Sequence, residues 1–232
     1  MGDPAHVLCV CTANVCRSPA AELLIRAGLR ARLGPSAAAE VLVSSAGTWA
    51  TPDRPVEPGT ASALRRTGVD AAAVAGARST RLTREAVAGA DLIIASTAEH
   101  VRAVWRLQLT SRHKTFTLGE LARLSEGVHG DDLPDGDGAA RLRALVARAS
   151  ALREERHRPG MPYVTEAYDL EDPTDNDPAQ RDMVEQTAAW ADFVLDTVAG
   201  PAPARRGYRD RVPGIARALE WSRHRSARGA IR

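Results

Sequence analysis

The sequence predicts an α/β protein in which helices cover both faces of a four-stranded parallel sheet. Short apolar runs alternate with stretches whose apolar residues recur at helical spacing, and such alternation is typical of parallel sheets. With 232 residues, of which 44% are hydrophobic and 26% charged, the chain can bury a substantial core. The four predicted strands cover residues 6–10, 40–47, 90–96 and 114–118.

Helices are predicted between and after these strands. The stretch after the first strand is amphipathic from Pro19 to about Leu33, so a strand, a tight loop and a helix follow one another. The last helix is expected from about Pro178 to Val198, with Asp177 in position to cap its N-terminus. Three further helices are expected over residues 59–68, 98–107 and about 139–156.

Two regions are expected to be additions to this core. Residues 125 to about 168 form a predicted helical insertion, which opens with the loop sequence SEGVHGDDLPDGDG. Residues 201–232 contain nine arginines but only two acidic residues, Asp210 and Glu220. We therefore expect a domain of residues 1–200 followed by a basic extension of residues 201–232. Two interpretations of the extension stay open: a solvated tail, or an element that binds an acidic partner.

The composition also limits location and partners. No apolar run approaches the roughly 20 residues that span a bilayer, so no membrane span is expected. The start MGDPAHVLCV lacks the features of a secretory signal, and a cytoplasmic location is expected. Apart from Tyr208 and Trp221, no aromatic residue is interleaved with the basic ones, so nucleic acid is not an expected partner.

All three cysteines lie in the stretch VLCVCTANVCRSPAAE, residues 7–22: Cys9, Cys11 and Cys16. A zinc site needs a fourth ligand, for which only His6 is near, and a thioredoxin-type redox pair needs the spacing Cys-x-x-Cys. Both interpretations are therefore disfavoured, and no metal or other cofactor is expected.

The spacing Cys11-x5-Arg17, between an apolar strand and a Ser-Pro helix start, indicates an oxyanion-binding loop. Successive backbone N–H groups and the helix dipole can hold a tetrahedral anion there, and the same field favours a thiolate. The Arg17 guanidinium can bind two phosphate oxygens. The residues between the two, all expected to contact the phosphate, are Thr12, Ala13, Asn14, Val15 and Cys16.

This stretch resembles the phosphate-binding loop of the low-molecular-weight protein tyrosine phosphatases. The resemblance extends to SSAGTWA (residues 44–50), to GARSTRLT (76–83) followed by ADLIIAS (90–96), and to YDLEDPT (168–174) before the last helix. It covers residues 5–198 except the insertion, and it does not reach the tail. The family fold is a four-stranded parallel sheet flanked by helices, in agreement with the pattern above.

The resemblance implies a phosphomonoester hydrolase. Cys11 is expected to attack phosphorus and form a cysteinyl-phosphate, while Arg17 and the loop N–H groups stabilise the transition state. Ser18 is expected to cap the helix and to donate its hydroxyl to the thiolate. Asn14 suits the positive-φ turn that the loop requires and is expected to brace it, with Ser45 either in the same network or a buried strand serine.

The leaving group needs a proton from a positioned acid. Two Asp-Pro pairs compete for this role, at Asp172 and at Asp177. Because Asp177 stands where the last helix needs its cap, Asp172 is assigned as the acid. Asp169 and Asp175 are expected to be solvated loop charges.

Several residues keep two interpretations. Cys16 packs in the core or, as the resemblance implies, traps an oxidised Cys11 in a reversible disulfide. Cys9 is expected in the core. Trp49 forms an aromatic wall for a phenyl ring or is an ordinary tryptophan.

Three positions depart from the family pattern. Ala13 stands where glycine is common, and Ala77 where a bracing histidine is common, so the loop must be braced from elsewhere. Thr174 stands where tyrosine or phenylalanine is usual, which removes an aromatic contact with phosphotyrosine. The substrate therefore stays open between a phosphorylated protein and a small aryl phosphate or metabolite.

Three other functions are possible alternatives to phosphomonoester hydrolysis, and the sequence disfavours each. Arsenate reduction needs further cysteines, and none follows Cys16. A phosphoarginine phosphatase carries threonine at the position of Val15, whose apolar side chain favours an aryl phosphate. A phosphate-sensing protein with poor turnover is disfavoured by the intact set of Cys11, Arg17 and Asp172.

Overall fold

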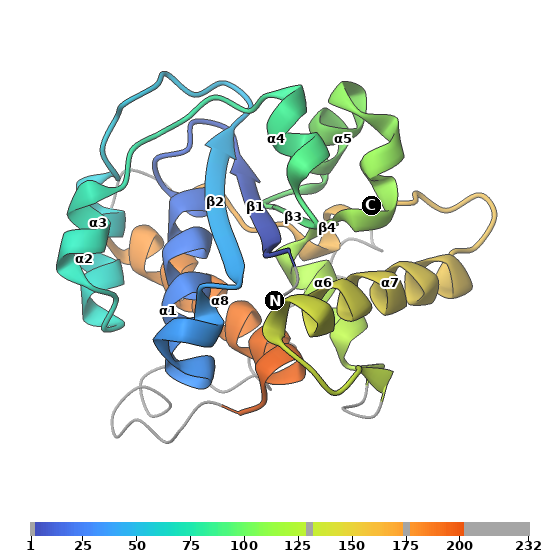
Figure 1. The fold of residues 1–232 in the computed structure, drawn as a ribbon. Helices are drawn as coiled ribbons and strands as arrows, with labels where there is room; N and C mark the ends of the chain where they lie inside the picture. Colours follow the sequence, from blue (N-terminus) through green and yellow to red (C-terminus); the bar gives the residue numbers. More distant parts are fainter. Residues whose placement is uncertain (1–2, 129–131, 174–176, 202–232) are drawn as a thin grey trace.

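The computed structural model describes residues 3–128, 132–173 and 177–201 (Figure 1). The basic extension from residue 202, Thr174 and Asp175 lie outside these ranges, so the predictions made for them are not addressed by the structure. No helix within the described ranges has the length and apolar character needed to cross a bilayer.

The predicted four-stranded parallel sheet is confirmed, with the strand order β2-β1-β3-β4. The strands are β1 (Ala5–Cys11), β2 (Val41–Gly47), β3 (Leu92–Ala95) and β4 (Thr115–Thr117). Cys11 pairs with Gly47 across β1 and β2, so the last residue of β1 lies at the carboxyl edge of the sheet. The phosphate-binding sequence begins at this edge.

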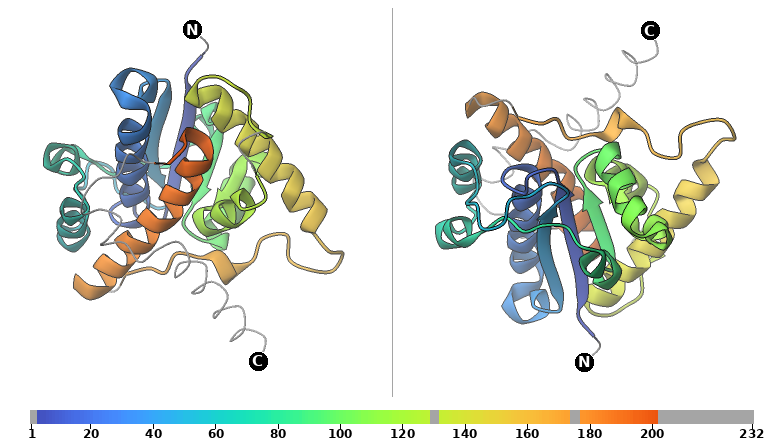
Figure 2. Two further views of the ribbon diagram at one scale, coloured as in Figure 1. Left: turned by 90° about the horizontal axis from the view of Figure 1, so that it is seen from below. Right: turned by 90° about the horizontal axis from the view of Figure 1, so that it is seen from above.

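Helices cover both faces of the sheet (Figures 1 and 2), as predicted. Alternate residues of β1 enter different cores because successive side chains of a strand point to opposite faces. Val7 and Cys9 pack with one set of helices, and Leu8 and Val10 pack with the other. The first set is α1 (Arg17–Ala38), α6 (Leu118–Ser125), α7 (Gly138–Arg156) and α8 (Asp177–Ala199), and the second is α4 (Arg84–Gly89) and α5 (Ala98–Leu107).

Two helices lie beside α1 and α8 rather than on the sheet, at the left of Figure 1: α2 (Pro58–Arg66) and α3 (Ala71–Gly76). The α2 helix corresponds to the one predicted over residues 59–68. The α1 helix continues past its predicted end, but Gly34 has a φ of 77° and interrupts it there. The α8 helix begins at Asp177 itself, one residue before the predicted start, so the prediction that Asp177 is its N-cap residue is wrong.

The short helices α3, α4 and α6 were not predicted from the sequence. The strand predicted over residues 114–118 ends at Thr117, because Leu118 already belongs to α6. Thr117 caps this helix: its Oγ1 accepts a hydrogen bond from the backbone N–H of Glu120 at 3.2 Å. The pattern Thr-x-x-Glu is a helix-start signal that the sequence contained.

The helix predicted within the insertion is α7, and it is part of the main core. Leu142, Leu145, Val146 and Ala149 are buried on its inner face. The α7 helix therefore helps to cover the sheet face opposite α4 and α5.

Candidate active site

The phosphate loop, defined here as residues 11–18, joins the carboxyl end of β1 to the start of α1. Cys11 is the last residue of the strand and Arg17 the first of the helix. Both side chains are buried, with residue exposures of 2% and 5%. Asn14 turns the chain between them with a φ of 57°, as predicted, whereas Ala13 has no positive φ and accommodates its methyl group.

Two hydrogen-bond donors are directed at the Cys11 sulfur. The backbone N–H of Asn14 donates to Sγ at 3.3 Å, and Ser18 Oγ lies 2.9 Å from Sγ. Asn14 Nδ2 donates to Ser18 Oγ at 2.8 Å, so the serine proton can be donated to the sulfur at 2.9 Å or to the Ala46 carbonyl at 3.4 Å, of which the sulfur is the closer. The Cys11 sulfur is therefore within hydrogen-bond distance of two groups of its own loop.

The prediction that Ser18 caps α1 is wrong. The helix begins at Arg17, two residues before the predicted start at Pro19, and its N-cap residue is Cys16, whose side chain makes no capping hydrogen bond. The Ser18 hydroxyl instead lies between Asn14 and the Cys11 sulfur.

A polar network outside the loop holds Asn14 in place. Its Nδ2 also donates to Ser45 Oγ at 2.8 Å, and Ser45 Oγ donates to Glu22 Oε2 at 2.7 Å. The backbone N–H of Thr80 donates to Asn14 Oδ1 at 2.7 Å. These contacts supply the bracing that Ala77 cannot provide, and neither Glu22 nor Thr80 was identified from the sequence.

Gly47 permits β2 to approach the loop closely. A Cβ atom at this position would lie 2.4 Å from the Thr12 carbonyl oxygen and 3.0 Å from the Asn14 nitrogen. The next two residues donate backbone hydrogen bonds to the loop: Thr48 to the Cys11 carbonyl and Trp49 to the Thr12 carbonyl, each at 2.9 Å. The sequence SSAGTWA therefore forms part of the wall that shapes the loop.

Arg17 connects the loop to the Asp-Pro segment, defined here as residues 169–173. Its Nη2 lies 2.9 Å from Asp172 Oδ1, and its Nη1 donates to the Leu170 carbonyl at 3.5 Å. Nη2 also donates to Thr12 Oγ1 at 3.4 Å. The Asp172 side chain is 74% exposed, in contrast to the buried guanidinium. The structure thus brings Cys11, Arg17 and Asp172 into one site.

His100 was not identified from the sequence, yet it lies against the loop. It is 5% exposed, with Nε2 at 2.9 Å from Thr12 Oγ1 and Nδ1 at 2.6 Å from Thr97 Oγ1. Burial, with a smaller contribution from the positive charge of Arg17, lowers the pKa of His100 to about 4. The imidazole is therefore neutral at physiological pH.

Asp169 is not the solvated charge that was predicted. Its Oδ1 accepts a hydrogen bond from the backbone N–H of Ala98 at 2.6 Å, and the N–H of Leu170 donates to the Ser96 carbonyl at 2.8 Å. The unpaired N–H groups of the first turn of α5 provide this partner, which is distant in sequence from Asp169.

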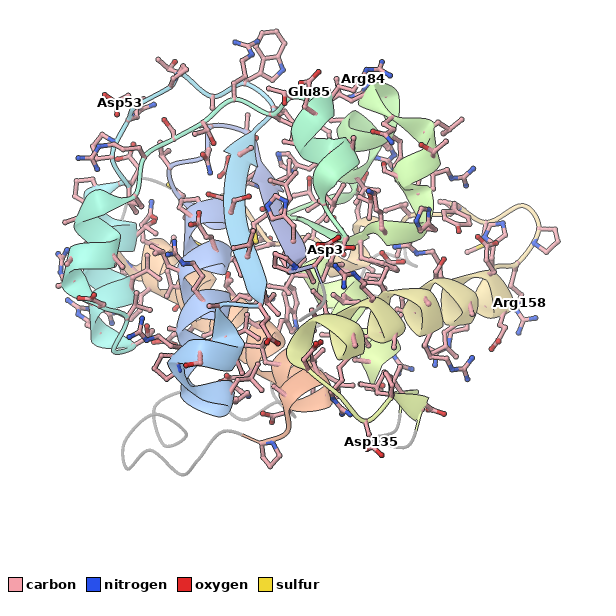
Figure 3. The ribbon with its side chains drawn as sticks, viewed as in Figure 1. Asp3, Asp53, Arg84, Glu85, Asp135 and Arg158 are labelled. Atoms are coloured by element: carbon pink, nitrogen blue, oxygen red, sulfur yellow. The ribbon has the colours of Figure 1, made fainter. Side chains whose placement is uncertain are left out.

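Trp49, whose backbone N–H donates to the Thr12 carbonyl of the phosphate loop, has a residue exposure of 76%. The Arg81 guanidinium lies 5.7 Å from the centre of its ring. In Figure 3, Asp53 and Arg84 mark the edge of the molecule where the strands end, and Asp135 marks the opposite end. Val15, in contrast to Trp49, is 6% exposed within the loop.

The other two cysteines differ from Cys11. Cys9 is fully buried in the core, as predicted, and burial raises the pKa of its thiol. Cys16 is half-buried against the core, and burial raises its pKa to about 11 despite a hydrogen bond from Thr60 that acts in the opposite direction. All three are free thiols in this structure.

The parallel sheet and a buried Cys-x5-Arg loop at its carboxyl edge define an α/β protein with a cysteine-containing oxyanion site. The chain belongs to the low molecular weight phosphotyrosine protein phosphatase family, because the model of that family matches residues 6–148. This confirms the resemblance found in the sequence.

Comparisons with individual proteins agree with this membership. The chain is 35% identical over 133 residues to a protein-arginine-phosphatase of Bacillus subtilis (strain 168), an alignment that covers 57% of this chain and 81% of the relative. It is 33% identical over 114 residues to the low molecular weight protein-tyrosine-phosphatase Etp of Escherichia coli (strain K12), covering 49% and 69%.

A solved structure confirms the fold. The low molecular weight protein tyrosine phosphatase from T. tengcongensis superposes with a TM-score of 0.57 at 23% sequence identity. The superposition covers 83% of this chain and 98% of that one.

Proposed function

We propose that this member of the family hydrolyses phosphomonoesters through a phosphorylated Cys11, with Asp172 as the general acid. One observation carries the proposal: the Cys11 sulfur receives two donors inside a buried loop, whose arginine is paired with an exposed aspartate. A nucleophile, an oxyanion-binding group and a proton donor are thereby placed in one site.

In the first step the Cys11 thiolate attacks phosphorus. A sulfur–phosphorus bond forms while the bond from phosphorus to the leaving oxygen breaks, and protonated Asp172 transfers its proton to that oxygen. The loop N–H groups and the Arg17 guanidinium stabilise the charge on the three remaining oxygens. The phosphate thus replaces Asp172 as a partner of Arg17.

In the second step water attacks the phosphorus of the cysteinyl-phosphate. The sulfur–phosphorus bond breaks, inorganic phosphate leaves, and Asp172, now a carboxylate, accepts the proton of the attacking water. Ser18 and the backbone of Asn14 stabilise the thiolate that departs, since both hydrogen-bond the sulfur in the free protein. The protein returns to its starting state without an external reductant.

The choice of Asp172 over Asp177 is supported by distance. Asp172 lies 2.9 Å from the Arg17 guanidinium, whereas Asp177 is the first residue of α8. An acid next to the phosphate-binding arginine can reach the leaving oxygen of a bound ester.

For the substrate we propose an aryl phosphate, either phosphotyrosine in a protein or a smaller aryl phosphate. Val15 is apolar and buried in the loop, where it offers no polar group to a substrate, and the exposed Trp49 is suited to pack beside an aromatic ring.

Phosphoarginine is the second candidate, because one relative is a protein-arginine-phosphatase. Two features of this chain disfavour it. Val15 has no hydroxyl to offer the guanidino group, and the positive charge of Arg81 beside Trp49 repels a guanidinium.

Two peptides of the same sequence, one with phosphotyrosine and one with phosphoarginine, would distinguish these substrates. We expect the wild type to have the higher kcat/KM for phosphotyrosine, and Val15→Thr to shift the ratio toward phosphoarginine. A wild-type preference for phosphoarginine would establish the second candidate.

The proposed chemistry itself is tested with para-nitrophenyl phosphate in the presence of a chelator. Turnover should be present in the reduced wild type and lost in Cys11→Ser. A reduced wild type that is inactive between about pH 5 and 8 would contradict the proposal, since catalytic groups are expected to work near that range.

The division into a domain of residues 1–200 and a basic extension remains a proposal, as does an acidic partner for that extension. It rests on the nine arginines that follow residue 200. Salt-dependent binding to an acidic protein, lost on truncation after Gly200, would support it, and equal binding by both forms would contradict it.

A further inference from the structure

The first turn of α5 lies between the two functional segments of the site. This helix is seen at the upper right of Figure 1, on the side where the strands end. Residues 96–100 contact the phosphate loop through one side chain and the Asp-Pro segment through the backbone. None of these residues supplies a reacting group in the proposed mechanism.

The contact with the loop is a chain of hydrogen bonds. Both ring nitrogens of His100 are within hydrogen-bond distance of hydroxyl groups, those of Thr97 and Thr12, at 2.6 and 2.9 Å. The ring orientation is therefore fixed whichever nitrogen carries the proton. Thr12 Oγ1 in turn accepts a hydrogen bond from Arg17. A buried, neutral imidazole thus holds the hydroxyl that contacts the phosphate-binding arginine.

The contact with the Asp-Pro segment uses the start of the same helix. Asp169 Oδ1 accepts from the Ala98 N–H, and the next residue, Leu170, donates to the Ser96 carbonyl. Leu170 is 2% exposed, and its own carbonyl accepts from Arg17. The chain is thus anchored immediately before the exposed Asp172.

We propose that the first turn of α5 is a positioning element, in which His100 orients Thr12 and Arg17 while the Ala98 N–H orients Asp172 through Asp169. The inference rests on the proposed function and adds two positioning residues to it, His100 and Asp169. The two positioning residues should therefore affect different steps of the reaction. Changes at His100 should impair phosphate binding, and changes at Asp169 should impair proton transfer to the leaving group.

The His100 half is tested with a matched pair. In His100→Gln the side-chain amide replaces Nε2 and can hydrogen-bond Thr12. In His100→Asn the shorter side chain places the amide where Nδ1 was, so it can hydrogen-bond Thr97 but not Thr12. We expect His100→Asn to lower kcat/KM for para-nitrophenyl phosphate about tenfold, as for modest misplacement of a catalytic group, and His100→Gln to recover most of the loss. The exposed neighbour Glu99, as Glu99→Gln, is the control and should stay within about twofold of the wild type.

The Asp169 half is tested with Asp169→Ala and Asp169→Asn. Only the asparagine keeps an oxygen that can accept from the Ala98 N–H. The alanine variant should lose about tenfold more kcat/KM on phenyl phosphate than on para-nitrophenyl phosphate, because the poorer leaving group depends more on the acid. The asparagine variant should lose less kcat/KM on phenyl phosphate than the alanine variant. If the role of Asp169 were purely structural, kcat/KM would fall equally for both substrates in both variants.

Binding of inorganic phosphate, measured by calorimetry in the Cys11→Ser background, separates this inference from the proposed function. There His100→Asn should weaken binding about tenfold, while Asp169→Ala should leave it within about twofold. If the wild type proves inactive, the proposed function fails, yet this measurement still tests the orientation of the loop.

Equal phosphate binding by Cys11→Ser with and without His100→Asn would overturn the His100 half. An equal loss on both aryl substrates in Asp169→Ala would overturn the Asp169 half. Should His100→Asn fail to fold, Thr12→Val tests the same contact, since it removes the hydroxyl with little change of shape.

Discussion

The phosphate loop and the Asp-Pro segment carry the two halves of the proposed reaction, but the structure holds them in different ways. In the loop, Cys11, Asn14 and Arg17 are buried. The Cys11 carbonyl accepts a hydrogen bond from the Thr48 N–H, and the Asn14 side chain is bound to Ser45 of β2 and to the Thr80 N–H. In the Asp-Pro segment, Leu170 is buried, whereas the Asp172 side chain is 74% exposed.

This difference follows from the chemistry of each half. Charge that develops on the phosphate is stabilised best by donors fixed beforehand in a dry site. The acid must instead reach a leaving oxygen that belongs to the exposed side of the substrate. An aspartate that is anchored through the residues before it, and whose own side chain is exposed beside Arg17, meets that requirement.

The largest loss of activity is expected when the phosphate loop loses the guanidinium group of Arg17. Arg17→Lys keeps the positive charge but cannot bind two phosphate oxygens while it contacts the Leu170 carbonyl. We expect kcat/KM for para-nitrophenyl phosphate to fall about 10³-fold, as for loss of an oxyanion donor. A loss below tenfold would show that a point charge is sufficient. Arg26→Lys, on the exposed face of α1, is the control.

Loss of the acid should give a smaller effect that depends on the substrate. Asp172→Asn keeps the shape of the side chain but cannot donate a proton, so kcat/KM for phenyl phosphate should fall about 10²-fold or more. The fall for para-nitrophenyl phosphate should be smaller, since its leaving group needs less assistance. Equal losses on both substrates would indicate a different acid, and Asp177→Asn would then be the variant to measure.

A methyl group at Gly47 should disturb the loop without removing any catalytic group. The added Cβ would lie 2.4 Å from the Thr12 carbonyl oxygen, so the strand or the loop must shift. We expect Gly47→Ala to lower the free energy of unfolding by about 1–3 kcal/mol and to reduce kcat/KM by about tenfold. Gly89→Ala, where no atom lies within 4 Å of the new Cβ, is the matched control and should change neither.

The smallest expected effect at physiological pH is a dependence of stability on pH that arises from His100 and grows only in acid. Its pKa is lowered from 6.5 to about 4 by burial and by Arg17, so the unfolded chain binds more protons between these pH values. The contribution to stability is therefore full above pH 6.5 and is lost as the pH falls toward 4, with a slope of at most about 1.4 kcal/mol per pH unit.

Chemical denaturation of the wild type and of His100→Gln across this range measures that contribution. The difference in the free energy of unfolding should change with pH in the stated direction. An unchanged difference would show that His100 titrates alike in the folded and unfolded chains.

The site residues could be predicted from the sequence where they lie close together in the chain. The strand, loop and helix around Cys11 follow one another without a break, so the positions of Arg17 and Asn14 could be predicted. The choice of Asp172 over Asp177 agrees with the proximity of Asp172 to Arg17, but the reason given for it was wrong, because Asp177 is the first residue of α8 and not its cap.

The sequence did not reveal hydrogen bonds whose two partners are far apart in the chain. Asp169 was predicted to be solvated because its partner, the Ala98 N–H, is 71 residues away. The contacts of Thr80 with Asn14 and of His100 with Thr12 span 66 and 88 residues. Such contacts depend on the order of the strands, which places β3 and α5 beside the end of β1.

The most direct test of the account is to trap the phosphorylated protein. The wild type, Asp172→Ala and Cys11→Ala would be mixed rapidly with para-nitrophenyl phosphate, quenched and mapped by mass spectrometry. We expect phosphate on the Cys11 sulfur, within the peptide that contains this residue. It should accumulate further in Asp172→Ala, because the attacking water then lacks its base, and it should be absent from Cys11→Ala. Turnover by the wild type with no phosphorylated peptide, or with phosphate on Cys16 or another residue, would contradict it.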